Sequence, residues 1–182
     1  MKKFSVKTIV AIGIGAALFF VLGKFVAIPS PVPNTTINVQ YGLLAFMAVV
    51  FGPVAGALVG FIGHMLIDMA AGWGIWWSWV ICSGIFGLLM GLAAKGMKMD
   101  EGKLGKKDLV VFNAAQVVIH LLCWVLLASV LDVYMMGEPW DKLFAQGLMA
   151  AIGNIVTTAI VGSLLCVAYA ATKTKAGSLT KE

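Results

Sequence analysis

Ionisable side chains stand inside two apolar stretches of this 182-residue chain, where burying them is costly. His64 and Asp68 are four residues apart, so in a helix they share one face. His120 precedes Trp124 by the same spacing in another apolar stretch. Carboxylate, imidazole and indole groups can hydrogen-bond the edge of a small ring and stack on its face. We interpret these residues as parts of a ligand pocket; hydrogen bonding between helices, or metal or proton chemistry, are the alternatives.

Further polar and aromatic residues mark other apolar stretches at a similar depth. Three tryptophans lie within residues 76–79, and because adjacent positions point in different directions, at most two of them face inward. Either Trp76 or Trp77 is expected to face the pocket. Trp73 and Trp140 instead suit an aromatic belt at the membrane surface. The candidate ligand-binding residues are Gln40, Tyr41, His64, Asp68, Trp76, Trp77, His120, Trp124 and Asn154.

Motifs of several familiar catalysts are missing from the sequence. The chain has no G-x-x-x-x-G-K-[ST] nucleotide loop, no H-E-x-x-H and no G-x-S-x-G. Its three cysteines stand far apart within apolar stretches and are expected to be small buried residues. A metal site formed by His64, Asp68 and His120 has no fixed ligand spacing to support it. We therefore expect no enzyme activity, no bound metal and no cofactor of the chain's own.

The composition predicts that the elements carrying these residues lie in a membrane. Hydrophobic residues make up 61% of the chain, charged residues only 12%, and the mean hydropathy is +0.99. Soluble domains carry about a quarter charged residues, so this outer surface must face lipid. The net charge is +5, but all thirteen basic residues are lysines in short clusters, without the arginine forks typical of nucleic-acid binding.

Breaks in the apolar pattern divide the chain into six predicted spans within one transmembrane domain, residues 1–182. Prolines at 29–33, Gly52 followed by Pro53, and glycines at 72 and 74 end three of them. The first apolar stretch is longer than that of a signal peptide and lacks a cleavage site, so we expect it to be retained. The fold class is all-α, a six-helix membrane bundle with spans at about 6–28, 39–50, 54–71, 75–94, 108–134 and 142–171.

The lysines predict the orientation of these spans. If the N-terminus is cytoplasmic, eleven of the thirteen lysines fall on the cytoplasmic side, and only Lys24 and Lys142 fall outside. Cytoplasmic loops are enriched in lysine, so both termini are expected inside. This orientation puts most of the candidate ligand-binding residues in the outer half of the membrane. The pattern predicts a pocket open to the outside, in which Gln40, Asp68, Trp77, His120 and Asn154 converge.

Small residues recur at helical spacing in the first span. Ala11 and Gly15 are four residues apart, as are Gly13 and Ala17. Such spacing lets another helix approach closely in lipid, either inside the protein or on a partner. The four residues are the candidate partner interface, and a bulky side chain at Gly15 is expected to block it.

Several of these segments, in order along the chain, carry a family resemblance. They are residues 11–17 (AIGIGAA), 29–34 (PSPVPN), 40–46 (QYGLLAF), 51–56 (FGPVAG), 60–64 (GFIGH) with Asp68, and 75–79 (IWWSW). The set resembles the substrate-binding S components of energy-coupling factor (ECF) vitamin transporters, in a UPF0397-like branch near the riboflavin-type S components. No single segment is specific, but together they cover nearly the whole chain.

The resemblance implies a six-helix fold in the bacterial cell membrane and a complex with other subunits. The partners would be a membrane-embedded coupling (T) subunit and two cytoplasmic ABC-type ATPases, which alone would use ATP. In this family the small-residue face of the first helix contacts the coupling subunit; Ala11, Gly13, Gly15 and Ala17 match it, with glycine replacing alanine at two positions. The resemblance also implies that the binding subunit topples in the membrane to release its substrate inward.

The substrate does not follow from the resemblance, since S components of similar fold bind different vitamins. Hydroxymethylpyrimidine, a pyridoxine-like ring, riboflavin and cobalamin are all candidates. One carboxylate, two histidines and tryptophan favour a compact aromatic ring of the hydroxymethylpyrimidine or pyridoxine type. Two other classes of function stay open: an intramembrane enzyme using His64, Asp68 and His120, and a membrane scaffold without a small ligand.

Overall fold

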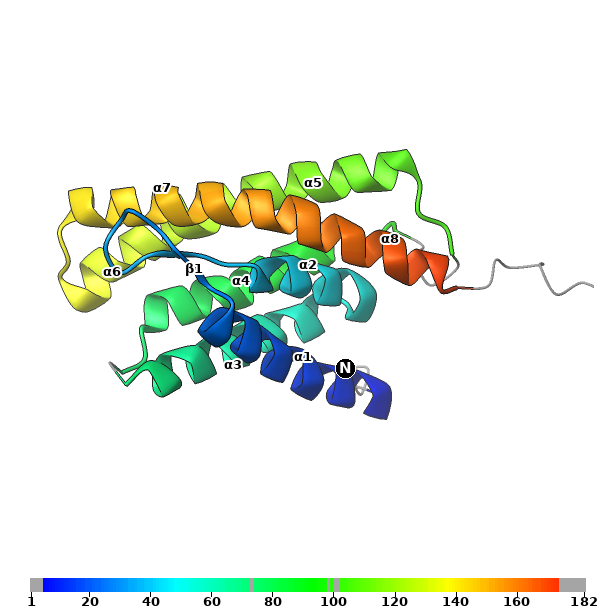
Figure 1. Ribbon diagram of the computed structural model, residues 1–182, viewed down its shortest axis with the longest axis horizontal. Coiled ribbons are helices and arrows are strands. Elements are labelled where there is room, and N and C mark those ends of the chain that lie inside the picture. The colour runs from blue at the N-terminus through cyan, green and yellow to red at the C-terminus, as the bar shows by residue number, and fades with distance from the viewer. Residues whose placement is uncertain (1–4, 73, 98, 100–101, 174–182) are drawn as a thin grey trace, which may run out of the picture.

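The computed structural model describes residues 5–72, 74–97, 99 and 102–173, and it confirms the all-α fold class (Figure 1). The described residues form six helical stretches, two of which change helix type along their length. The first four are α1 (Val6–Phe25), α2 (Gln40–Phe51), α3 (Pro53–Ala71) and α4 (Trp77–Ala93). The fifth joins α5 (Lys106–His120), η2 (Leu121–Ala128) and α6 (Ser129–Met136), and the sixth joins α7 (Trp140–Thr157), η3 (Thr158–Gly162) and α8 (Ser163–Ala171).

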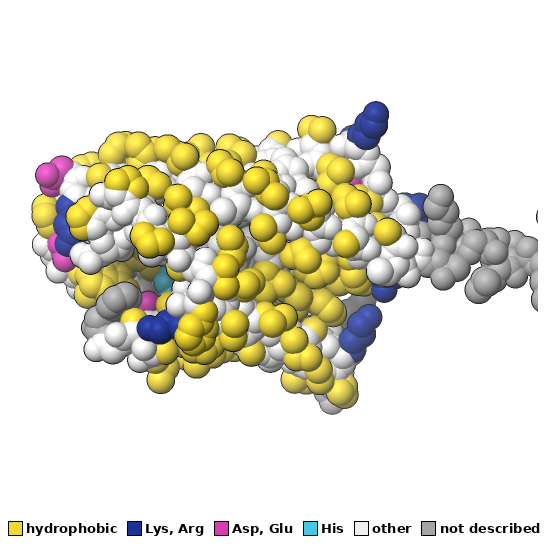
Figure 2. Space-filling model, viewed as in Figure 1, with side chains coloured by type: hydrophobic (Ala, Val, Ile, Leu, Met, Phe, Trp, Pro, Cys, Tyr) yellow, Lys and Arg dark blue, Asp and Glu magenta, His cyan; other side chains and the backbone are white. Residues whose placement is uncertain are grey.

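Four of these stretches are long and apolar enough to cross a membrane: α1, α3, the stretch Lys106–Met136 and the stretch Trp140–Ala171. The helices α2 and α4 are apolar but shorter, with 12 and 17 residues. At 1.5 Å per residue α2 is only about 18 Å long, against about 30 Å of hydrocarbon. Large apolar side chains cover much of the outer surface in Figure 2, as expected for a protein surrounded by lipid. Six complete crossings remain a prediction.

The ends of the first span show how local sequence sets the boundaries. The helix α1 ends at Phe25, three residues before the predicted end of the span. The chain then forms a short antiparallel ladder between β1 (Ile28–Pro29) and β2 (Thr36–Ile37). Proline disfavours helical geometry in the residue before it, so an extended segment here follows from Pro29. Residues 26–39 thus form a strap between α1 and α2.

The helices α3 and α4 lie close together because glycines replace side chains where they cross. A Cβ atom at Gly56 would collide with Gly87 and Ala48, and one at Gly60 would collide with the backbone of Ser83. Small residues allow such an approach in membrane proteins, where dispersion contacts hold helices together. This contact fixes the position of α4, and therefore of its N-terminal tryptophans, relative to the face of α3 that carries His64 and Asp68.

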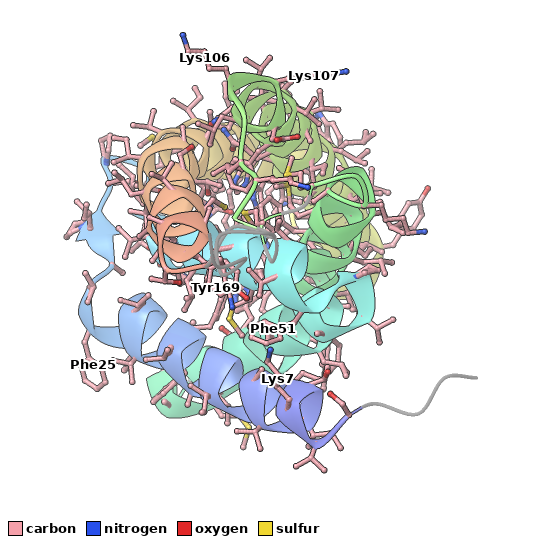
Figure 3. All side chains as sticks on the ribbon, turned by 90° about the vertical axis from the view of Figure 1, so that its right-hand side faces the viewer. Lys7, Phe25, Phe51, Lys106, Lys107 and Tyr169 are labelled. Atoms are coloured by element: carbon pink, nitrogen blue, oxygen red, sulfur yellow. The ribbon has the colours of Figure 1, made fainter. Side chains whose placement is uncertain are left out.

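The bundle has two chemically different ends. Figure 3 looks onto the end where α1 begins, and the labelled Lys7, Lys106 and Lys107 lie there. We call this the Lys-rich end; the N-terminus of α5 and the C-termini of α4 and α8 also lie there (Figure 1). Among the described lysines, Lys24 near the end of α1 and Lys142 near the start of α7 lie toward the opposite, Lys-poor end. Five further lysines of the predicted cytoplasmic side lie outside the described residues, at positions 2, 3, 98, 175 and 181.

The placement of the lysines allows a direct test of orientation. We predict that a single cysteine replacing the exposed Lys103 is labelled by a membrane-impermeant maleimide only from the cytoplasmic side. A cysteine replacing Lys142, at the Lys-poor end, should be labelled only from outside. The native cysteines Cys82, Cys123 and Cys166 are buried and should give little background. Labelling of the Lys103 variant in intact cells would contradict the orientation.

Candidate ligand-binding site

The helix α3 brings His64 and Asp68 together at the Lys-poor half of the bundle. The Nε2 atom of His64 lies 3.8 Å from Oδ1 of Asp68, and the two side chains are 14% and 6% exposed. Figure 2 shows a hollow near the Lys-poor end with histidine and acidic side chains visible inside it. Of the two histidines in the sequence, His64 is partly exposed and His120 is completely buried. His64 is therefore partly accessible to solvent, whereas Asp68 is buried beside it.

Asp68 also determines where α4 begins. Its Oδ2 atom accepts a hydrogen bond from the backbone N–H of Trp76 at 2.9 Å. The chain turns back after α3 through Gly72, whose φ of +83° favours glycine. Because the first N–H groups of a helix have no partner within it, a carboxylate from α3 satisfies one of them here. The sequence pattern identified Asp68 but not this role.

His64 is linked to α2 and α4 through two hydroxyl groups. Its Nδ1 atom lies 2.6 Å from Oγ of Ser83, which in turn lies 3.0 Å from the hydroxyl of Tyr41. The Tyr41 ring is buried and packs edge-on against Phe19, Phe86, His120 and Trp124. Tyr41 therefore joins the His64 and Asp68 pair to the aromatic core, as far as the second histidine.

His120 is buried and fully bonded rather than open to the hollow. Trp124 donates its indole N–H to Nδ1 of His120 at 2.7 Å. Indole is a donor only, so Nδ1 accepts, and Nε2 of a neutral ring is left to donate to Thr158 Oγ1 at 3.0 Å. Trp124 stacks on Trp79 with ring centroids 5.3 Å apart. This arrangement places His120 and Trp124 in the buried core of the bundle.

The two tryptophans that the sequence left as alternatives lie in different surroundings. Trp76 is half-buried and donates its indole N–H to Asp132 at 2.5 Å. Trp77 is 41% exposed and packs its ring at a tilt against Phe61. The structure thus bonds Trp76 to Asp68 and Asp132, and it leaves Trp77 on the outer surface. Trp140 is also exposed, whereas Trp73 lies outside the described residues.

Asp132 is a functional candidate that the sequence pattern did not single out. It is 1% exposed and accepts hydrogen bonds from the Ser78 hydroxyl and from the indole N–H groups of Trp76 and Trp79. The signal was present in the sequence, since a carboxylate at position 132 falls within the predicted span 108–134. No motif marks Asp132, and its three donors all lie within residues 76–79, more than fifty residues earlier in the sequence.

Asn154 and Gln40 lie apart from this network. Asn154 accepts a hydrogen bond from the backbone N–H of Asn38 at 3.0 Å, while Thr157 donates to the Asn38 carbonyl at 2.8 Å. These bonds hold the strap, residues 26–39, on α7. Gln40 is buried at the start of α2 and faces Gly23 of α1. Asn154 thus secures the strap, and the Gln40 side chain packs between α2 and α1.

The small residues of α1 separate onto two faces. Ala11 and Gly15 are buried, and a Cβ atom on Gly15 would collide with Met47 and Val59. Gly13 and Ala17 are exposed, and a Cβ atom on Gly13 would meet nothing within 4 Å. Positions two apart on a helix point about 200° apart, so the two pairs cannot share a face. The structure thus places Gly15 inside the bundle, and the partner interface predicted from the four residues stays a prediction.

The fold and the hollow define a membrane-embedded helical protein with a polar, aromatic-lined site near one end. A family model described as ECF-type riboflavin transporter, S component, matches residues 3–171, so the chain belongs to this family. It is a membrane protein and the substrate-binding subunit of an ECF transporter. Within the described residues, no three potential metal ligands of the His, Cys, Asp or Glu type cluster together.

Full-length relatives support this membership. The chain is 50% identical over 181 residues to a UPF0397 protein of Enterococcus faecalis, covering all of this chain and 99% of that protein. It is 49% identical to UPF0397 proteins of an Exiguobacterium species and of Streptococcus pneumoniae, with at least 98% of each protein covered. The similarity therefore spans the whole transmembrane domain rather than one segment.

The different surroundings of Trp76 and Trp77 predict different effects on stability. Trp76→Ala removes a donor from the buried carboxylate of Asp132, which should cost roughly 1.5–3 kcal/mol of unfolding free energy. The matched control Trp77→Ala changes a surface side chain and should stay within about 0.5 kcal/mol. Unfolding of both variants in detergent would measure the difference. Equal losses would show that the Trp76 bond is not important for folding.

Proposed function

We propose that this chain captures a compact, water-soluble aromatic heterocycle from the outer side of the membrane. The observation that carries the proposal is the His64 and Asp68 pair, bonded to the Trp76 backbone, in the Lys-poor half of the bundle, where Figure 2 shows a hollow. Ionisable groups are costly inside an apolar bundle, and a purely structural role would not require His64 to be partly exposed to solvent. Apolar walls with a few convergent polar groups are typical of small-molecule sites.

The chemistry of the cluster favours a particular kind of ligand. Asp68 supplies carboxylate oxygens as acceptors, and His64 supplies a ring nitrogen that can donate or accept. Trp76, whose backbone is bonded to Asp68, has a half-buried side chain, so a flat ring could stack on its indole. A small ring bearing an amino or hydroxymethyl group, such as hydroxymethylpyrimidine or pyridoxine, would satisfy these groups together. The family description names riboflavin, a larger ring system, which is the natural competitor in a binding test.

Delivery of the ligand inward would depend on partner subunits. We propose that this chain, with both termini in the cytoplasm, works with a membrane coupling subunit and two cytoplasmic ABC-type ATPases. ATP would be used by the ATPases and not by this chain. The binding subunit would topple within the membrane, so that the hollow at the Lys-poor end opens toward the cytoplasm.

The exposed side of α1 is the surface that suits the coupling subunit. Gly13 and Ala17 lie on it beside the large exposed side chains of Ile14 and Leu18. Small residues flanked by large apolar ones let a second helix approach closely, which stabilises helix pairs in lipid. The interface predicted from the four small residues is thus reduced to Gly13 and Ala17.

The ligand-binding proposal predicts that Asp68→Asn weakens affinity. Losing a charged hydrogen bond to a ligand should cost roughly 1.5–3 kcal/mol, which is about ten- to a hundredfold in Kd. Calorimetry with hydroxymethylpyrimidine, pyridoxine and riboflavin would test both the residue and the ligand class, with Trp77→Ala as the control that keeps wild-type affinity. Binding of riboflavin alone would contradict the compact-ring proposal, and unchanged affinity in Asp68→Asn would contradict the site.

The two faces of α1 predict opposite outcomes for two similar substitutions. Gly13→Leu should leave ligand binding and melting temperature of the isolated subunit unchanged, but abolish association with the coupling subunit and therefore uptake. Gly15→Leu should lower the melting temperature even without a partner, because the new side chain collides with Met47 and Val59. Co-purification and uptake assays measure the first effect. Normal assembly of the Gly13→Leu protein would contradict the proposed interface.

A further inference from the structure

The carboxylate of Asp132 collects three side-chain donors from one turn at the start of α4. Oδ1 accepts from the Trp76 indole and the Ser78 hydroxyl, and Oδ2 accepts from the Trp79 indole at 2.7 Å. Asp132 is 1% exposed, so it cannot contact a ligand in the hollow directly. A buried carboxylate is tolerated only when several donors surround it, and an acceptor so surrounded also fixes the direction of each donor.

Trp76 is held at two points by two carboxylates from different helices. Its backbone N–H donates to Asp68 on α3, and its indole N–H donates to Asp132 on α6. With both ends of the residue fixed, the plane of the indole is set as well. Among the described residues no aromatic ring packs against the Trp76 ring, and the side chain is only half-buried. The Trp76 side chain is therefore partly open to solvent.

Trp79 receives its orientation from the same carboxylate. Its indole N–H points at Asp132 while its ring stacks on Trp124, with centroids 5.3 Å apart and an angle of 24° between planes. Trp124 in turn donates to His120. Asp132 thus connects the half-buried indoles of α4 to the buried histidine on α5.

We propose that Asp132 is a positioning residue that holds the Trp76 and Trp79 indoles in the orientation required to bind the ligand ring. Asp132 acts on the ligand only through these indoles, and Trp76 provides the stacking surface. The effect on affinity rests on the proposed function, whereas the effect on the indoles can be measured without any ligand. Asparagine at position 132 has one acceptor oxygen in place of two, so it cannot keep all three bonds.

The experiment uses the full chain in detergent, labelled with 5-fluorotryptophan and observed by 19F NMR. Trp76→Phe and Trp79→Phe assign the two resonances. Asp132→Asn should shift both, whereas Ser78→Ala, which removes another hydrogen bond to the same carboxylate but keeps both indole bonds, should leave them close to wild type. Affinities for hydroxymethylpyrimidine and pyridoxine are then measured on the same samples, together with melting temperatures.

We expect Asp132→Asn to lose about tenfold in affinity and Ser78→Ala less than twofold, even where their melting temperatures fall by similar amounts. Unshifted tryptophan resonances in Asp132→Asn would overturn the proposal, as would shifted resonances with wild-type affinity. If neither probe binds the wild type, the proposed ligand class fails, and the spectra alone decide whether Asp132 orients the indoles. Should Asp132→Asn not fold, Trp76→Phe removes the same bond from the other side and must show the affinity loss.

Discussion

Two carboxylates within a bundle of apolar helices must find their hydrogen-bond donors in the protein, because hydrocarbon offers none. Asp68 and Asp132 both find them at the first turn of α4. The position of that turn therefore depends on α3 and α6 together, although the two helices lie far apart in the sequence. The positions of Trp76 and Trp79 follow from this arrangement.

A second constraint acts where α3 and α4 cross nearer their middle. The backbone of Ser83 lies against Gly60, and its hydroxyl lies within hydrogen-bonding distance of both His64 and Tyr41. The same residue thus takes part in the close glycine contact and in the polar network. Because the backbones cannot slide without breaking this contact, the imidazole of His64 is held at a fixed depth. Glycines on the packing face support the site without touching a ligand.

The sequence predicted those features that depend on local pattern. Apolar runs and their glycine and proline breaks predicted the helices, and the spacing of His64 and Asp68 predicted their shared face. It could not decide between Trp76 and Trp77, because the choice depends on which of them reaches Asp132 from another helix. Gly15 was assigned to a partner, since spacing alone does not tell which side of α1 is already covered by α2 and α3. Asn154 was grouped with the pocket by depth, whereas its bond to the strap depends on how residues 26–39 fold back.

Native mass spectrometry of the gently purified protein tests the central claim most directly, namely that the Lys-poor hollow holds a small molecule and not only bonds between helices. The account predicts that wild-type protein carries a small-molecule adduct, that Trp77→Ala retains it and that Asp68→Asn has lost most of it. Wild-type protein that is always free of adduct after exposure to the compact-ring compounds and riboflavin, or equal occupancy in Asp68→Asn, would contradict the account.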